Sequence, residues 1–261
     1  MGRVFASSDW HGCLDPAQKV LDFLQPDDKL YFIGDAIDRG PHGYQIMTKL
    51  LYDPRVIYIK GNHEEMMLEA IENMVRYGLE DYCYSGLDDI WLYGNGGEKT
   101  FKDMNYGKGI NLPCLYKKIK DMPLLCNYTS KNGKNIILEH AGYTPNSIGK
   151  SKWKKHDPLW DREHFWDEWT GDENTYLIHG HTPVQYLKFE DGYIDCLPLT
   201  KEELQLKTTW DIKGKYIPQV IRYCNKHKFD IDMCTIISGR IALIDLDTFE
   251  IIYFDKEKNN D

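Results

Sequence analysis

Short apolar runs and amphipathic segments alternate along the first 60 residues. Residues 3–7, 30–33 and 56–59 are compact, apolar and partly β-branched, which is typical of strands. Residues 15–24 and 44–52 lie between them and carry apolar side chains at helical spacing. The order strand, helix, strand, helix, strand predicts a parallel sheet with right-handed crossovers.

Helical spacing dominates residues 64–120. Residues 64–77 are rich in Met, Leu and Glu, and shorter helices are predicted at 97–105 and 112–120. We expect these helices to form a cap region beside the sheet.

Strand patterns return in the second half, and we expect them to form a second sheet packed on the first. A turn at residues 131–133 predicts a hairpin between the first two of these strands. The whole pattern predicts an α/β fold, a single domain over residues 1–261 with two stacked mixed β-sheets flanked by helices. The predicted strands are residues 124–128, 136–139, 176–179, 186–189, 229–231, 240–245 and 250–254.

Residues 191–222 interrupt this rhythm with two Pro, a charged KEE and no clear strand alternation. They predict an insertion. Two interpretations of this insertion are a loop on the surface, which is the commoner case, and a flap that determines which substrates bind.

Composition excludes several classes of partner. The formal net charge of −9 gives no overall attraction to nucleic acid or anionic lipid, so we expect no stable nucleic-acid binding. No apolar run is long enough to span a bilayer, and Asp9 follows too few apolar residues for a signal peptide. The seven Cys form no CxxC pair and are odd in number, which favours a reducing cytoplasm.

Metal-binding residue types stand where the predicted strands end. Ligands of α/β sheets collect beyond the carboxyl ends of strands, so we expect these side chains to meet at one rim. Carboxylate, imidazole and amide donors together favour Mn, Fe, Zn or Co over Mg or Ca. A shared carboxylate can bridge two ions roughly 3.5 to 4 Å apart, and Asp35 is the natural bridge. The residues are Asp9 and His11 in SDWHG, Asp35 and Asp38 in GDAIDRG, Asn62 and His63 in GNHE, His140, and His179 and His181 in HGHTP.

The motif GDAIDRG followed by GNHE resembles the metallophosphoesterases and, within them, the phosphoprotein phosphatase branch. The chain is most similar to bacterial and phage-type phosphatases, where a WxxxNGG segment also occurs, here WLYGNGG at 91–97. The resemblance implies the αββα sandwich of that family and two divalent transition-metal ions, with Mn favoured. It also implies the site roles: Asp9 and His11 on the first metal, Asp35 bridging, Asn62, His140 and His181 on the second, His63 as general acid oriented by Asp38, and Arg39 and Arg162 on phosphate.

Three departures from the family pattern leave these ligands in place. SDWHG replaces GDxHG, and HAG at 140–142 replaces HGG. Relatives with GHxH supply a further His to the first metal, whereas Pro183 stands there in this chain. This leaves a coordination position open for water or substrate. His179 is expected to support His181 and not to bind metal.

The resemblance implies a metal-dependent phosphomonoester hydrolase, in which a hydroxide activated by the dinuclear centre attacks phosphorus in line. A serine/threonine protein phosphatase acting on phosphoproteins or small phosphorylated substrates is the favoured reading. Two alternatives stay open: a symmetrical dinucleoside tetraphosphatase or other nucleotide phosphohydrolase, and a non-catalytic binding module on the same fold.

The basic run at 150–156 and Cys13 each allow a structural and a functional interpretation. The basic run at 150–156 is a solvated loop or, alternatively, a lip that collects anionic substrate. Cys13 follows the first metal motif, and a small packing role is favoured over a ligand role.

Overall fold

The computed structural model describes residues 2–78, 90–142, 157–162, 164–166, 169, 171–186, 195–196 and 218–257. Within these ranges no helix is both long enough and apolar enough to cross a membrane.

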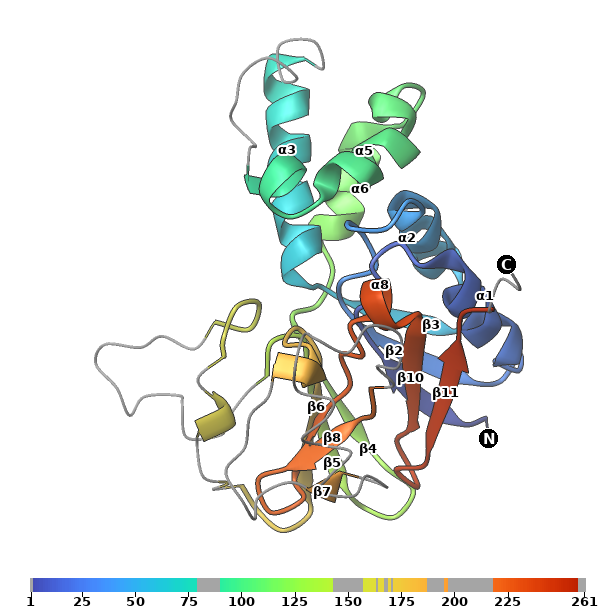
Figure 1. The fold of residues 1–261 in the computed structure, drawn as a ribbon, viewed down its shortest axis with the longest axis vertical. Coiled ribbons are helices and arrows are strands. Elements are labelled where there is room, and N and C mark those ends of the chain that lie inside the picture. Colours follow the sequence, from blue (N-terminus) through green and yellow to red (C-terminus); the bar gives the residue numbers. More distant parts are fainter. Residues whose placement is uncertain are drawn as a thin grey trace.

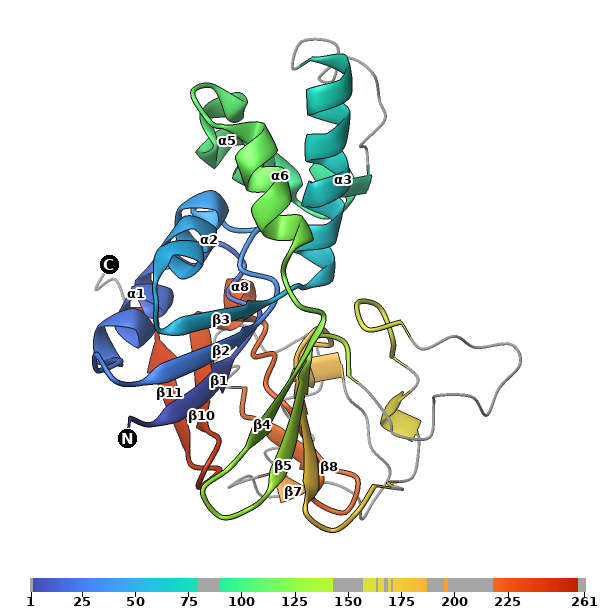
Figure 2. The ribbon, with the colours of Figure 1, turned by 180° about the vertical axis from the view of Figure 1, so that it is seen from behind.

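Three parallel strands and two connecting helices form the first half of the fold, in the predicted order. The helices cover one face of the sheet (Figures 1 and 2). The elements are β1 (Val4–Ser7), α1 (Leu14–Phe23), β2 (Lys29–Ile33), α2 (Gly43–Tyr52) and β3 (Val56–Ile59).

The last two strands belong to this first sheet, and our assignment of them to the second sheet was wrong. β10 (Arg240–Asp245) pairs antiparallel with β1, and β11 (Ile251–Asp255) pairs antiparallel with β10. The sheet order is therefore β11-β10-β1-β2-β3. An alternating apolar pattern identifies a strand but does not specify its partner, which is why the error arose.

The second sheet has the order β4-β5-β6-β9-β8-β7. Its first two strands form the predicted hairpin around residues 131–133. The strand predicted at 186–189 is wrong at its first residue, because a 3₁₀ helix, η4 (Val184–Tyr186), ends there, and residues 187–189 lie outside the described ranges. The strands are β4 (Leu125–Thr129), β5 (Asn135–Glu139), β6 (Thr175–His179), β7 (Asp195–Cys196), β8 (Ile221–Tyr223) and β9 (Lys228–Asp230).

The region predicted as an insertion, residues 191–222, contains β7 and the first two residues of β8. These strands pair antiparallel in the second sheet and are too short to show an alternating pattern. Residues 191–194 and 197–217 lie outside the described ranges, so the insertion stays a prediction.

Helices project from one end of the two sheets in the predicted cap region (Figures 1 and 2). The long helix begins two residues earlier than predicted, at Asn62, and this places Asn62 and His63 in its first turn. The elements are α3 (Asn62–Tyr77), a π-helical turn η1 (Ile90–Gly94), α5 (Gly97–Asp103), a 3₁₀ turn η2 (Asn105–Gly107) and α6 (Leu112–Lys120).

Alternation along the strands separates two hydrophobic cores. In β2, Leu30 and Phe32 pack toward the helices, whereas Ile33 packs between the two sheets with Ile136 and Ile178. Each sheet is thus held by apolar burial, and the ends of its strands are free to carry polar loops.

Candidate metal centre

Six of the ten predicted site residues adopt backbone conformations that L-residues rarely use. Their φ angles lie between 42° and 70°, in the left-handed region, and such a conformation costs about 1–3 kcal/mol per residue. These conformations persist only where the surrounding structure enforces them, and they concentrate at functional sites. The six are Asp9, His11, Asp35, Asp38, Arg39 and His181.

The motif loops are tied to one another at the carboxyl ends of β1, β2 and β3. The His11 N–H donates to the carbonyl of Asp35 at 3.0 Å. The N–H of His63, in the first turn of α3, donates to Asp35 Oδ1 at 3.1 Å. A helix start leaves N–H groups unpaired and favours negative charge, so this position suits a carboxylate.

Asp35 lies at the centre of two groups of side chains that could each hold a metal ion. His11, Asp35 and His63 form one group, and Asp35, His140 and His181 form the other. In each group the possible ligand atoms lie within 4.8 Å of one another. Asp35 Oδ2 lies 3.7 Å from His11 Nε2, and Asp35 Oδ1 lies 3.4 Å from His140 Nε2. The geometry therefore places Asp35 where a bridging ligand would be.

The environment of His140 fits a bound cation. Its Nδ1 lies 2.8 Å from the carbonyl of Ile33, which fixes the Nδ1–H as donor. Its Nε2 then faces Asn62 Oδ1 at 2.9 Å and Asp35 Oδ1, both of which are acceptors. A proton or a metal ion must therefore lie between Nε2 and these oxygens. Burial lowers the pKa of His140, but the charge of Asp35 outweighs burial and raises the pKa to about 10.

Buried carboxylates lie in and around this cluster, and their negative charge needs compensation by positive charge. Burial, together with Asp232, raises the pKa of Asp9 well above its usual range. Burial would also raise the pKa of Asp35, but the imidazoles of His140 and His63 outweigh it and hold the pKa well below its usual range. Asp232 is a fully buried acid that our sequence reasoning missed. Buried charges need compensation, and a pair of divalent ions would supply it.

Asp9 lies beside the first group, and Asn62 lies between the imidazoles of the second. Asp9 Oδ1 is 3.9 Å from His11 Nε2, and Asp9 accepts from the His181 N–H at 3.3 and 3.2 Å. Asn62 Oδ1 is 3.0 Å from His181 Nδ1. All six predicted metal ligands are thus brought to one site.

His63 and Asp38 form a separate buried pair. His63 Nδ1 lies 2.7 Å from Asp38 Oδ2, and both side chains are fully buried. Trp91 Nε1 donates to the same Asp38 oxygen at 2.9 Å, and Thr100 Oγ1 donates to Oδ1 at 2.7 Å. Gly97 packs on the Trp91 indole, where a Cβ would lie 2.6 Å from ring atoms. The cap region therefore fixes Asp38, a contact that our sequence reasoning missed although it noted the motif at 91–97.

Two guanidinium groups reach the imidazoles. Arg39 donates to Nε2 of His11 and to Nε2 of His63, at 2.9 Å each, so both rings carry their proton on Nδ1 here. Arg162 Nε lies 3.3 Å from Nε2 of His181. Both Arg residues are therefore at the site, and their planar forks suit phosphate oxygens.

Glu64 locks the bridging loop and was missed at the sequence level. Its Oε2 accepts from the N–H groups of Asp35 at 2.8 Å and Gly61 at 2.9 Å. Its Oε1 accepts from Ala36 N–H at 3.0 Å and Tyr58 Oη at 2.9 Å. Gly61 is required because a Cβ there would lie 2.2 Å from Asp35 Oδ1. The Glu of GNHE thus holds the loop that presents Asp35.

Replacing Glu64 with Gln should destabilise the fold by about 3 kcal/mol, because the new amide would turn a donor toward buried donors. The matched control is Glu65→Gln, which removes only a partly exposed ion pair with Lys60 at 2.9 Å and should cost less than about 1 kcal/mol. Urea unfolding of both variants measures the difference. Equal losses would contradict the locking role.

His179 belongs to neither group of possible metal ligands among the described residues. Its Nε2 bonds to Tyr223 Oη at 2.7 Å, and that hydroxyl lies 3.2 Å from His164 Nδ1. Burial lowers the pKa of His179 to about 3, so it is neutral. His164 in turn packs against Gly142, where a Cβ would lie 2.5 Å from the ring. This chain of rings connects the HAG turn, the Arg162 segment and the HGHTP loop.

The basic run at 150–156 lies outside the described residues. Its two readings therefore stay predictions.

Comparison with known proteins places the chain in a family. Residues 2–210 match the family model of the calcineurin-like phosphoesterases. Serine/threonine-protein phosphatase 1 of Salmonella typhimurium is 27% identical over 191 residues, which cover 70% of this chain and 80% of that protein. A symmetrical bis(5'-nucleosyl)-tetraphosphatase of Legionella pneumophila is 27% identical over 147 residues, which cover 54% of this chain and 45% of that protein.

The fold is shared with a solved structure described as a candidate diadenosine tetraphosphatase. The TM-score is 0.54 at 14% identity, and the match covers 99% of this chain and 95% of the other. The family uses a dinuclear divalent metal centre, and the residues described above could bind such ions. The chain belongs to the calcineurin-like phosphoesterases and is a phosphoric ester hydrolase.

Proposed function

We propose that this enzyme is a metal-dependent phosphomonoesterase acting on phosphoserine or phosphothreonine in proteins. The observation that carries the proposal is the sharing of Asp35 by two groups of possible ligands, beside the buried pair of His63 and Asp38. The alignment with serine/threonine-protein phosphatase 1 covers 80% of that protein's length, and this supports phosphoproteins as the proposed substrate class.

The proposed cofactor is a pair of divalent ions, with manganese favoured by the mixed oxygen and nitrogen donors. The first ion would be held by Asp9 and His11 and the second by Asn62, His140 and His181, with Asp35 shared. When bound, the ions supply Lewis acidity and positive charge to the phosphoryl group.

Arg39 and Arg162 would bind the phosphoryl oxygens, and His63 would donate a proton from Nε2 to the leaving oxygen. The Asp38 carboxylate lies 2.7 Å from His63 Nδ1, which holds the ring with Nε2 as the atom that would deliver the proton. Arg39 donates to the same Nε2 at 2.9 Å. Phosphate binding would therefore draw Arg39 away and free Nε2 to carry its proton.

Four cysteines in the described part of the chain are free thiols: Cys13, Cys114, Cys126 and Cys234. They support the cytoplasmic location that we propose.

The tetraphosphatase relative makes nucleotide hydrolysis the second candidate. A non-catalytic module is set aside, because the family match supports a phosphoric ester hydrolase.

Purified enzyme supplied with Mn²⁺ should hydrolyse a phosphothreonine peptide with a kcat/KM at least about 10-fold above that for a symmetrical dinucleoside tetraphosphate, a difference that one set of specific contacts can supply. An aryl phosphate assayed in parallel reports that the centre is active. A large preference for the tetraphosphate would overturn the proposed substrate class.

A further inference from the structure

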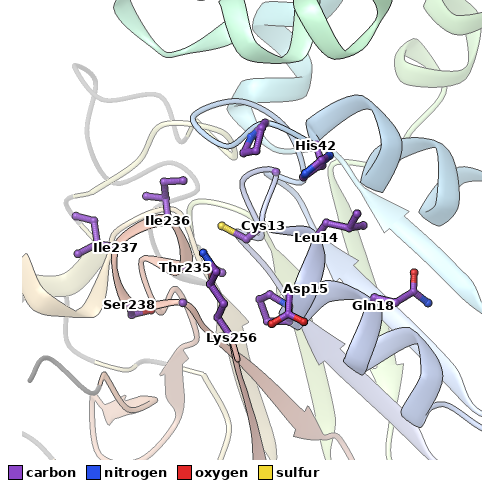
Figure 3. A pocket seen from close by; sticks show the side chains of 14 residues that line it. Cys13, Leu14, Asp15, Gln18, His42, Thr235, Ile236, Ile237, Ser238 and Lys256 are labelled. Atoms are coloured by element: carbon purple, nitrogen blue, oxygen red, sulfur yellow. The ribbon is translucent and has the colours of Figure 1, made fainter. Parts of the chain in front are cut away.

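A pocket of about 670 Å³ lies between the start of α1, the loop that follows Arg39, and α8 (Thr235–Ser238). Figure 3 shows its wall, with Cys13 and Leu14 on one side and the two isoleucines of α8 on the other. Its lining combines aliphatic side chains and a thiol with polar groups. Cys13, Leu14, Pro16, Pro41, Ile236 and Ile237 form the apolar part, and Asp15, Gln18, His42, Thr235, Ser238 and Lys256 form the polar part. This volume lies in the range of small-ligand pockets, about 300 to 1,000 Å³.

The pocket shares a backbone wall with the phosphate site. Gly12 follows His11 directly, and Pro41 lies two residues after Arg39. Gly40 and Gly12 touch so closely that a Cβ on Gly40 would lie 2.3 Å from the carbonyl oxygen of His11. Two residues of extended chain span at most about 7 Å, so the backbone at Pro41 lies within that distance of the backbone at Arg39.

The isoleucines of α8 are exposed at the edge of this pocket. Ile236 is 36% exposed and Ile237 is 58% exposed. The turn that presents them is held from within, because Thr235 is buried and its carbonyl accepts from the Gly239 N–H at 2.8 Å. Ser238 Oγ also donates to the Met233 carbonyl at 2.8 Å. The apolar edge is therefore part of the folded structure, and covering it would release apolar area from water.

The acidic side chain of the pocket, Asp15, is paired. It accepts from the Glu257 N–H at 2.8 Å and from Lys19 Nζ at 3.3 Å, and this bonding lowers its pKa, so the carboxylate is ionised at neutral pH and its charge is compensated by Lys19.

The chemistry of the lining favours an aliphatic occupant over a nucleobase. His42 supplies a ring, but no Phe, Tyr or Trp is among the described residues that line the pocket. Proteins usually hold nucleobases between aromatic or Arg planes.

We propose that this pocket receives an aliphatic side chain next to the phosphorylated residue of a peptide substrate. It is then a specificity site that selects phosphopeptides by their flanking sequence. The inference rests on the proposed protein phosphatase function and extends it.

The test uses phosphothreonine peptides that carry Leu, Gly or Asp at one flanking position at a time, with an aryl phosphate as reference. The full-length enzyme should hydrolyse the Leu peptide with a kcat/KM about 10-fold above that of the Asp peptide at one flanking position or more. One apolar group that fits a pocket can supply a difference of this size. Ile237→Asp should remove that preference and lower the ratio of peptide kcat/KM to aryl phosphate kcat/KM about 10-fold, and Ile237→Ala should fall between. The matched control is Val75→Asp on α3, an aliphatic residue 52% exposed and outside the pocket, which should keep both the ratio and the preference.

Three outcomes would overturn the inference. Peptides hydrolysed without a flanking preference would show that the pocket does not read sequence, with the proposed function intact. A leucine preference that survives in Ile237→Asp would place the recognition elsewhere. Hydrolysis of the aryl phosphate and the tetraphosphate, but of no phosphopeptide, would overturn the proposed function together with this inference.

Discussion

Asp35→Asn is expected to remove bound metal and to lower kcat more than about 100-fold. This is a larger loss than is usual when a residue that only hydrogen-bonds to a metal ligand is replaced. Asp35 is common to both groups of possible ligands, and its two oxygens face different imidazoles. An amide has one oxygen acceptor and no negative charge, so it cannot serve both ions. Plasma mass spectrometry of dialysed protein measures metal per chain, and an aryl phosphate assay measures kcat.

The control for this change is Asp22→Asn in α1, whose carboxylate accepts from Gln18 at 2.8 Å on an exposed surface. It should keep both metal and activity. Full metal content in Asp35→Asn would contradict the bridging role.

His63→Asn is expected to lower kcat by about 10²- to 10⁴-fold, the usual contribution of general acid catalysis, while metal stays bound. The prediction follows from the buried contact of His63 Nδ1 with Asp38 at 2.7 Å, which fixes Nε2 as the atom that can deliver a proton. The defect should be smaller for an aryl phosphate than for a phosphothreonine peptide, because the aryl oxide leaves without needing a proton.

The geometry alone also groups His63 with His11 and Asp35 as a possible metal ligand. The dependence on the leaving group separates the two roles. An equal loss for both substrates, with loss of metal, would make His63 a ligand and would leave the enzyme without this proton donor.

The first half of the fold was predictable because its signals are local. Strands β1 to β3 are apolar runs of four or five residues, and the helices between them have helical spacing. The motifs stand directly after these strands, so the gathering of Asp35, His63 and their neighbours followed from the topology of a parallel sheet.

The rest of the fold depends on contacts that are distant in sequence. β10 has the pattern of a buried strand, but its pairing with β1 joins residues more than 230 positions apart, such as Phe5 and Asp245. Strands β7 and β8 have two and three residues and show no period that a sequence reader could use.

The supporting residues of the site were hidden for the same reason. Trp91 and Thr100 reach Asp38 across 53 and 62 positions, and only the packing of the cap region brings them there. Glu64 offered the one usable signal, an acid at the start of a helix in a motif. Its four donors come from two loops and a strand, which no local pattern indicates.

The central claim is that one set of residues holds two ions while another set transfers the proton. The most direct test is to measure metal content side by side in the wild type, His63→Asn and Asp35→Asn. After loading with Mn²⁺ and dialysis, we predict two ions per chain in the wild type, two in His63→Asn and a loss in Asp35→Asn. Loss of metal in both variants, or a wild type that binds none and leaves an aryl phosphate intact, would contradict the account.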